Sequence, residues 1–191
     1  YRKWKRNGLI EELHEMLRDF TRKKAGRQVS PGLGLIDSRS VKTSRNGGLE
    51  RGIDGGKKIK GRKQPVITDT TGLILTVVIH AANIHDSKAA FHVIKKLRGR
   101  FPRLSKIIAD GGYRGELIEQ VKNAFGWILE VVLRPEQTRK FTVLPKRWIV
   151  ERTFFWFESF RRLSKDYEVD TESSQTMIYL TMIQIMLNRI R

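Results

Sequence analysis

The sequence contains no cysteine among its 191 residues, and this absence excludes disulfide bonds and thiolate zinc sites. The four histidines, His14, His80, His85 and His92, lack the spacing of zinc ligands as well. A metal ion held by this chain would therefore bind oxygen ligands, which favours Mg²⁺ or Mn²⁺.

Acidic residues are scarce beside basic ones, since 20 Asp and Glu stand against 38 Lys and Arg, for a formal net charge of +18. Such an excess of positive charge predicts a polyanionic partner. Long apolar runs are also lacking, and none comes close to the roughly 20 residues that cross a bilayer. No signal-peptide pattern opens the chain. We therefore expect nucleic acid as the partner and no membrane.

Hydrophobic residues make up 39 % of the sequence, which is enough to build one globular domain with a sizeable core. Apolar periodicity and helix-capping residues predict helices over 8–24, 87–101, 115–125, 147–166 and 173–191. Runs rich in β-branched residues predict strands over 33–37, 65–72, 73–81, 105–110 and 127–133, the second and third forming a hairpin. This order predicts an α/β fold with a mixed sheet flanked by helices.

Two of the predicted strands end on an aspartate, at Asp37 and at Asp110. An ordinary Asp-Gly turn is one interpretation of the second, because two glycines follow Asp110. In open α/β sheets, however, sites form at the carboxyl ends of strands, so the two side chains could meet. Two carboxylates held close together repel each other unless a cation lies between them.

Glu151 offers a third carboxylate, on a helix with unusually apolar neighbours. A salt bridge to Arg147, four residues earlier, is the simpler interpretation of this residue. Taken together, however, Asp37, Asp110 and Glu151 are the ligands that a pair of Mg²⁺ ions would need to cut or join phosphodiesters in line. The net charge agrees with this chemistry, because it would attract a phosphate backbone.

Five blocks between about Leu33 and Tyr167 carry a specific pattern: "LIDSRSVKTS", "GKKIKGRKQPVITDTTGLIL", "HAANIHDSKAA", "IIADGGYRG" and "RWIVERTFFWFESFRRLSKDYE". In this order they resemble bacterial insertion-sequence transposases of the DDE type, in the insertion-sequence-five group. The resemblance implies a ribonuclease-H-like fold in which the acids come from the first strand, the strand after the first helix and a late helix. Asp37, Asp110 and Glu151 occupy these places.

The resemblance also implies an activity and its partners. It implies a transposase that cleaves DNA at the ends of an insertion sequence and transfers the strands, using two Mg²⁺ or Mn²⁺ ions held by the three acids. The implied partners are double-stranded DNA, both the terminal inverted repeats and the target, and a second copy of the chain in the synaptic complex. The implied location is the bacterial cytoplasm, in association with the nucleoid.

The wider family carries a Tyr, Arg, Glu, Lys signature with two, three and six intervening residues. Arg147 and Glu151 fit it, whereas Leu144 stands at the Tyr position and Glu158 at the Lys position. The nearby cations that could replace the signature Lys are Arg161, Arg162 and Lys165. From the family's organisation we expect residues 1–28 to be the end of an N-terminal helical DNA-binding region and residues 29–191 to be the catalytic domain.

The basic side chains predict where DNA is held. Residues 39–63 carry nine basic and two acidic side chains, which predicts a flexible basic loop. We expect Lys42 and Arg114, each a few residues past an aspartate, to hold the scissile strand. The cations expected to contact phosphates beside Asp37 are Lys57, Lys58, Lys60, Arg62 and Lys63. The cations of the late helix that are also expected to contact DNA are Arg147, Arg161, Arg162 and Lys165.

The crowded aromatic residues of the late helix are Trp148, Phe154, Phe155, Trp156 and Phe157, and core packing is the favoured interpretation over stacking on bases. Two further functions stay open from the sequence. One is a nuclease of the same fold that cleaves without strand transfer. The other is a domesticated, non-catalytic protein that binds nucleic acid, for which the net charge alone would suffice.

Overall fold

The structure is a computed structural model that describes residues 2–45, 48, 50–133 and 146–191, so Leu144 lies outside the described residues. Its strands are β1 (Leu33–Lys42), β2 (Gly52–Asp54), β3 (Ile59–Thr68), β4 (Ile74–Val77), β5 (His80–Ala81), β6 (Lys106–Asp110) and β7 (Ile128–Val132). Its helices are α1 (Arg2–Arg6), α2 (Leu9–Lys24), α3 (Asp86–Lys95), α4 (Leu117–Phe125), α5 (Arg147–Glu158) and α6 (Thr171–Ile190). Two 3₁₀ turns, η1 (Gly111–Tyr113) and η2 (Arg161–Leu163), follow β6 and α5.

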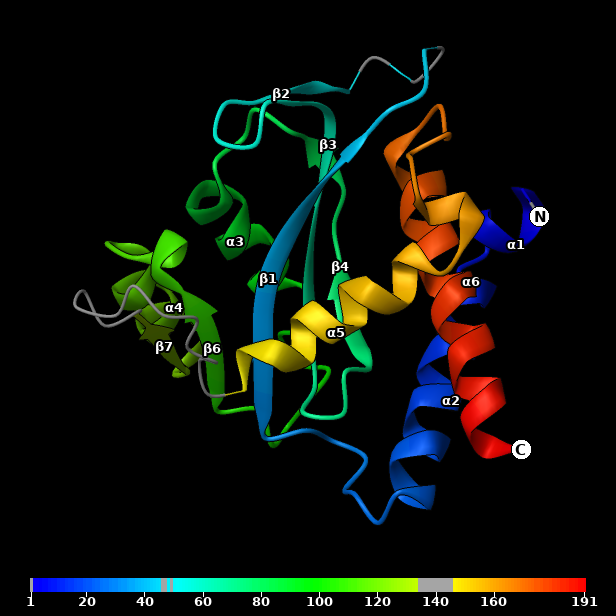
Figure 1. The fold of residues 1–191 in the computed structure, drawn as a ribbon. Coiled ribbons are helices and arrows are strands. Elements are labelled where there is room, and N and C mark those ends of the chain that lie inside the picture. Colours follow the sequence, from blue (N-terminus) through cyan, green and yellow to red (C-terminus); the bar gives the residue numbers. More distant parts are fainter. Residues whose placement is uncertain (1, 46–47, 49, 134–145) are drawn as a thin grey trace.

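The described strands form one mixed sheet. Its path is β2-β3-β1-β6-β7, and β4 and β5 also pair with β3. The long strand β3 is antiparallel to β1, whereas β6 is parallel to both β1 and β7. The predicted mixed α/β sheet and the hairpin of β3 and β4 are therefore confirmed (Figure 1).

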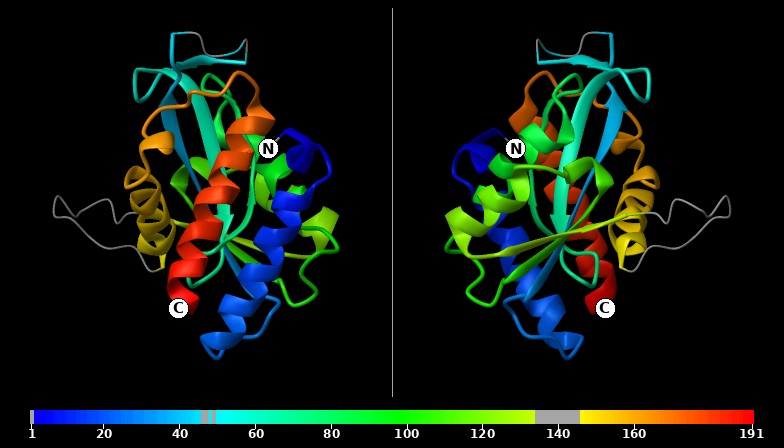
Figure 2. Two further views of the ribbon diagram at one scale, coloured as in Figure 1. Left: turned by 90° about the vertical axis from the view of Figure 1, so that its right-hand side faces the viewer. Right: turned by 90° about the vertical axis from the view of Figure 1, so that its left-hand side faces the viewer.

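Two hydrophobic clusters cover the two faces of the sheet, because successive side chains of a strand point in opposite directions. Leu35 of β1 and Ile108 of β6 belong to the cluster that packs under α5 and α6. Ile36 of β1 and Ile107 of β6 belong to the cluster under α3 and α4. Figure 2 shows these helices on opposite sides of the sheet. The face that α5 covers is the one that carries the candidate site.

Several local predictions differ from the structure. The helix predicted over 87–101 ends at Lys95. The first strand does not end at Asp37 but continues to Lys42, because β3 pairs with it along its whole outer half. The prediction of a flexible basic loop over 39–63 is also wrong, because this segment includes the end of β1, all of β2 and the start of β3. Helix α5 ends at Glu158, eight residues before the predicted end at 166, and the chain turns into η2.

Helix α2 packs beside α6 through a polar side chain, His14, which is buried against the ring of Tyr179 at 4.9 Å. Burial, together with the positive charges of Arg18 and Arg100, lowers the pKa of His14 from its usual value to about 3. In the unfolded chain the imidazole regains a pKa near 6.5. Between pH 6.5 and 3 the unfolded chain therefore holds more protons here than the folded chain does.

We expect acid to destabilise the fold through His14, because stability decreases as the pH is lowered wherever the unfolded state binds more protons than the folded state. The free energy of unfolding in urea should fall from about pH 7.5 to about pH 5, and His14→Phe, which cannot titrate, should make this fall smaller. His92→Gln, at an exposed histidine, is the control and should leave the fall unchanged. An equal fall in His14→Phe and in the parent chain would rule His14 out.

Among the described helices, none has the length and apolar character that crossing a membrane requires.

Candidate active site

Strand register brings Asp37 and Asp110 to the same level of the sheet. The parallel pairing of β1 with β6 aligns Leu35 with Ile108, and each aspartate lies two residues further along its own strand. Because side chains alternate between the faces, Asp37 points to the same face as Leu35, and Asp110 to the same face as Ile108. Both carboxylates therefore lie on the face that α5 covers.

Short hydrogen bonds fix the orientation of the two aspartates. Oδ1 of Asp37 accepts from the backbone N–H of Ser38 at 2.7 Å, and Oδ1 of Asp110 accepts from the N–H of Gly112 at 2.8 Å. A Cβ at Gly112 would lie 3.0 Å from Oδ1 of Asp110, which explains why glycine suits this position. In each aspartate the second oxygen, Oδ2, remains for a partner from α5.

Arg147 and Glu151 lie four residues apart on α5 and therefore share one face of this helix. Nη2 of Arg147 lies 3.1 Å from Oδ2 of Asp37, 3.3 Å from Oδ2 of Asp110 and 3.7 Å from Oε1 of Glu151. The three acids, far apart in sequence, thus converge on a single cationic nitrogen. The simpler interpretation of Glu151, a salt bridge to Arg147, is also what the structure shows.

The three acids differ in how far their side chains are exposed to solvent. The side chain of Asp37 is 15 % exposed, that of Asp110 31 % and that of Glu151 56 %. Burial raises the pKa of Asp37, and the negative charge of Asp110 adds to this, whereas Arg147 and the N–H of Ser38 lower it. The positive charge of Arg147 therefore offsets part of the cost of burying the Asp37 carboxylate.

In the described part of the chain, no three Asp, Glu or His side chains are gathered closely enough to hold a metal ion as they stand. The guanidinium of Arg147 lies at the point that the three candidate acids share. The donor set nevertheless fits a hard divalent cation, since it consists of carboxylate oxygens directed at one positive charge.

Sequence reasoning missed Arg39, which lies two residues after Asp37 on the same face of β1. Its Nε donates to Gln64 at 2.7 Å, and its guanidinium lies 4.9 Å from the ring centre of Phe157 on α5. Burial lowers the pKa of Arg39 to about 10, although the charge of Glu158 opposes this shift. Arg39 thus places a cation beside the glutamate that stands at the signature Lys position, and strand alternation from Asp37 could have identified it.

Eight of the predicted DNA-contacting cations have exposed side chains: Lys42, Lys57, Lys58, Lys60, Arg114, Arg161, Arg162 and Lys165. Arg114 folds back over the turn after Asp110, since a Cβ at Gly111 would lie 3.0 Å from its Nη2. Arg162 pairs with Glu168 at 2.7 Å.

The basic turn before β3 lies far from Asp37. The partner of Asp37 in the register is Val66, and Lys60 lies six residues before Val66, a distance of roughly 20 Å along β3. The sequence predicted that the turn carrying Lys57 and Lys58 lies beside Asp37, and this prediction is wrong.

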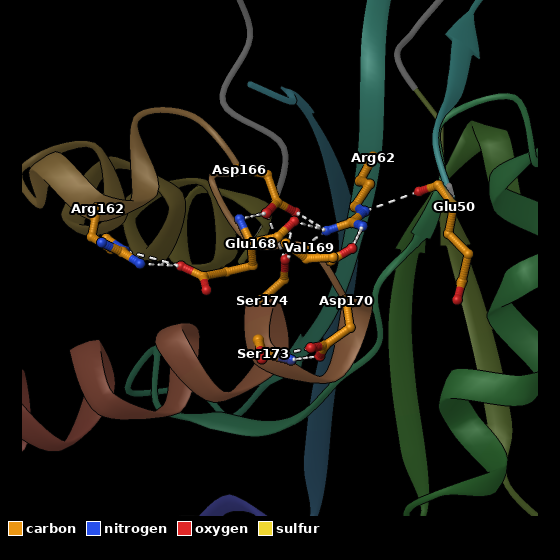
Figure 3. Close-up of polar contacts among 9 residues, drawn as sticks. All are labelled: Glu50, Arg62, Arg162, Asp166, Glu168, Val169, Asp170, Ser173 and Ser174. Atoms are coloured by element: carbon orange, nitrogen blue, oxygen red, sulfur yellow. Dashed lines mark hydrogen bonds and ion pairs between the residues drawn. The ribbon is translucent and has the colours of Figure 1, made fainter. Parts of the chain in front are cut away.

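The prediction that Arg62 contacts DNA is wrong, because its side chain is fully buried in β3. Figure 3 shows its guanidinium enclosed by Asp166, Ser174 and the backbone of the segment before α6. It donates to Oδ2 of Asp166 at 3.2 Å and to the carbonyl oxygens of Glu50, Glu168 and Val169 at 2.8 to 2.9 Å. Arg62 is therefore a structural cation that ties β3 to the chain before α6.

Lys63 is wrong as a DNA contact for the same reason. Its side chain is 9 % exposed, and its Nζ lies 3.3 Å from Asp86 and 3.9 Å from Asp54.

The aromatic residues of α5 differ in their exposure. Phe157 is buried, as predicted for core packing, whereas Trp148 and Phe155 are 46 % and 67 % exposed.

Strand order and acid placement together define the class of this domain. The acids come from the first strand, from the strand that follows α3 and from a late helix, as expected for a ribonuclease-H-like domain. Residues 29–187 match the family described as "Transposase DDE domain", and the chain belongs to this family. The narrower assignment to the insertion-sequence-five group stays a prediction.

One curated relative is a protein of Burkholderia cepacia named as a transposase for insertion sequence element IS402. It is 33 % identical over 116 residues, which cover 56 % of this chain and 54 % of the relative. The chain therefore spans about half the length of the curated relative that it matches.

Among solved structures, the catalytic core domain of BIV integrase is similar with a TM-score of 0.45 and 14 % identity, covering 82 % of this chain and 94 % of that one. The catalytic domain of Mos1 mariner transposase is similar with a TM-score of 0.44 and 10 % identity, covering 94 % of this chain and 89 % of that one.

Proposed function

We propose that this chain carries the catalytic site of a DNA transposase, which cleaves and transfers DNA strands at the ends of an insertion sequence. The observation that supports this most directly is the convergence of Asp37, Asp110 and Glu151 on one positively charged group. Carboxylates brought together from two strands and a helix are an arrangement that phosphodiester chemistry needs and that a mere DNA-binding surface does not need. Membership of the transposase family agrees with this proposal.

Asp37, Asp110 and Glu151 would hold the divalent ions, either Mg²⁺ or Mn²⁺, with two ions as the expected number. Such ions supply an activated water or 3′-hydroxyl and stabilise the departing oxygen. The chain's own residues orient this site, because the N–H groups of Ser38 and Gly112 fix one oxygen of each aspartate. The exposed cations on the same molecule would attract the phosphate backbone and hold it by charge.

Arg147 would act as an internal substitute for the metal. Nη2 lies within 3.7 Å of all three acids, so it neutralises their mutual repulsion in the metal-free chain. Arg147 would have to move away before Asp37, Asp110 and Glu151 could hold a divalent ion, because its guanidinium contacts all three acids. The released guanidinium could then bind a DNA phosphate, for which its planar fork of donors is suited.

Replacing Arg147 should separate its stabilisation of the three acids from its competition with a metal ion. We expect Arg147→Met to lower the stability of the metal-free chain by about 1 to 3 kcal/mol, because the largely buried Asp37 loses its cation. Mn²⁺ should then raise the midpoint of thermal unfolding more in this variant than in the parent, because no side chain competes with the ion. Arg152→Met, further along α5, is the matched control. An equal Mn²⁺ response in Arg147→Met and the parent would contradict the substitution of arginine for metal.

The proposed activity is tested with labelled duplexes that carry the ends of the element encoding this chain. Cleavage should require Mg²⁺ or Mn²⁺, and pre-cleaved ends should be joined to a target duplex. Cleavage without joining would instead indicate the nuclease, and binding without either reaction would indicate the non-catalytic protein. The affinity for DNA should fall steeply with salt, because phosphate contacts release counterions.

A further inference from the structure

A cleft lies between helices α3 and α4, which cover the face of the sheet opposite to α5 (Figure 2). This α3–α4 cleft has a volume of about 520 Å³. Pockets that bind small organic molecules enclose roughly 300 to 1,000 Å³, so the cleft is large enough for one. Its lining includes Ser87, Lys88, Phe91, Arg114, Glu116 and Gln120, and none of the three candidate acids.

The α3–α4 cleft lies close to the three acids along the chain. Asp110 ends β6, η1 follows, and Arg114 comes directly after η1. Four residues of backbone span at most about 14 Å, which limits the distance between Asp110 and Arg114. Helix α3 packs against η1 as well as against α4. Because successive phosphates of a duplex strand advance by about 3.4 Å, DNA held at the acids could place a nucleotide only a few positions away in the cleft.

The lining combines positive charge with an aromatic ring and an amide. Lys88 and Arg114 have exposed side chains at the cleft. Phe91 is partly buried, and its ring is supported by the ring of Phe125 at 5.5 Å. Gln120 offers an amide, which can both donate and accept hydrogen bonds. A negative phosphate, a flat base and the polar edge of that base are the groups that such a lining can bind, and together they make up a nucleotide.

The ring of Phe91 is open only to a base that has left its own stack. Inside a duplex the neighbouring base pairs cover both faces of a base, and a base that is already unpaired is the least costly to extract. A free nucleotide would be held by a few exposed side chains alone. DNA attracted by the net charge of +18 instead brings its nucleotides to the cleft at a high effective concentration. DNA is therefore the favoured source of the nucleotide.

We propose that the α3–α4 cleft binds an unpaired nucleotide of the DNA that is held at the three acids. In this arrangement Phe91 stacks on the base, and Lys88 and Arg114 contact the adjoining phosphates. Glu116 opposes these phosphates through its negative charge. The inference rests on the proposed function for its DNA, but binding in the cleft requires neither a metal ion nor cleavage.

Fluorescence anisotropy without divalent metal tests the proposal on three labelled DNAs: a blunt duplex, the same duplex with a single-stranded extension of three nucleotides at its 3′ or 5′ end, and a blunt duplex longer by three base pairs. The longer duplex controls for the added phosphates. For one of the two polarities, the extended duplex should bind at least about fivefold more tightly than either blunt duplex, as expected when one base stacks on an aromatic ring. Asp110→Asn should show the same preference, so the result is independent of the proposed catalysis.

Phe91→Ala should abolish the preference for the single-stranded extension and leave binding of the blunt duplexes unchanged. Phe20→Ala, at a phenylalanine of α2 that is 55 % exposed, is the control and should keep the preference. Circular dichroism shows whether each variant is folded. If Phe91→Ala does not fold, Arg114→Gln, at an exposed residue, replaces it and should weaken binding of the extended duplex more than that of the blunt ones. A parent chain without the preference, or a folded Phe91→Ala variant that keeps it, would overturn the proposal.

Two acids of the same region provide a test in the opposite direction. Glu116→Gln and Glu119→Gln each remove one negative charge, but only Glu116 lines the cleft. Glu116→Gln should therefore strengthen binding of the extended duplex more than Glu119→Gln does, and equal effects would contradict the location. A free deoxynucleoside monophosphate at about 1 mM should not displace the extended duplex. Displacement would identify a site for free nucleotides and overturn the assignment to DNA.

Discussion

Asp110→Asn should abolish DNA cleavage and strand transfer while leaving the fold and DNA binding intact. The loss should exceed about 100-fold, because changing groups that merely support metal ligands already costs about 10- to 100-fold. The substitution is nearly isosteric, and the amide oxygen can still accept from the N–H of Gly112. It removes one of the three negative charges around Nη2 of Arg147. Any effect on stability should therefore stay within about 1 kcal/mol, as for a partly exposed ion pair.

The measurement pairs a cleavage assay in Mg²⁺ with DNA binding by fluorescence anisotropy and with thermal unfolding. Glu119→Gln, at an exposed acid on α4, is the matched control and should retain full activity. Because binding and folding are followed separately, inactivity through misfolding is distinguished from loss of the reaction. Normal Mg²⁺-dependent cleavage by Asp110→Asn would remove this residue from the mechanism.

Arg62→Met should lower the free energy of unfolding strongly, by about 3 to 5 kcal/mol. The substitution leaves the carboxylate of Asp166 buried and without its cation, and it leaves the carbonyl oxygens of Glu50 and Val169 without their donor. The segment before α6 would lose its attachment to β3. Urea unfolding measures the loss, and Lys60→Met, at an exposed lysine of the same strand, should change stability by no more than about 0.5 kcal/mol.

The double variant Arg62→Met with Asp166→Asn identifies the cause of this loss. Without the carboxylate no unpaired charge remains, so the double variant should be more stable than Arg62→Met alone. The new amide could still accept from the Ser174 hydroxyl, which donates to the Asp166 carboxylate at 2.6 Å in the parent chain. A double variant that is less stable than Arg62→Met alone would show that the buried charge is not the dominant cost.

The acids could be predicted from the sequence because the signal is local. "LGLID" and "IIAD" are apolar runs that end on an aspartate, and each run identifies a buried strand that carries an acid. Strand β6 ends at Asp110, whereas β1 continues past Asp37 to Lys42. The partners of the acids could not be predicted in the same way. Arg147 was expected to contact Glu151, one turn away, but its contacts with Asp37 and Asp110 depend on how α5 lies across the sheet (Figure 1).

The burial of Arg62 and Lys63 could not be predicted either. Their segment is rich in glycine and positive charge, which is the composition of a solvated loop. It forms a strand because β1 pairs with it on one side and β5 on the other. The guanidinium of Arg62 then finds its partners in Asp166 and Ser174, more than 100 residues later. Long-range pairing of this kind leaves no pattern in the local sequence.

Mn²⁺ binding to the chain alone, followed by the loss of the electron paramagnetic resonance signal of free Mn²⁺, tests the three-acid site most directly. We expect the parent chain to bind Mn²⁺, and we expect Asp37→Asn and Asp110→Asn each to weaken binding more than about tenfold. Glu119→Gln should bind as the parent does. Equal binding by the parent and both aspartate variants would show that Asp37 and Asp110 do not hold the ion.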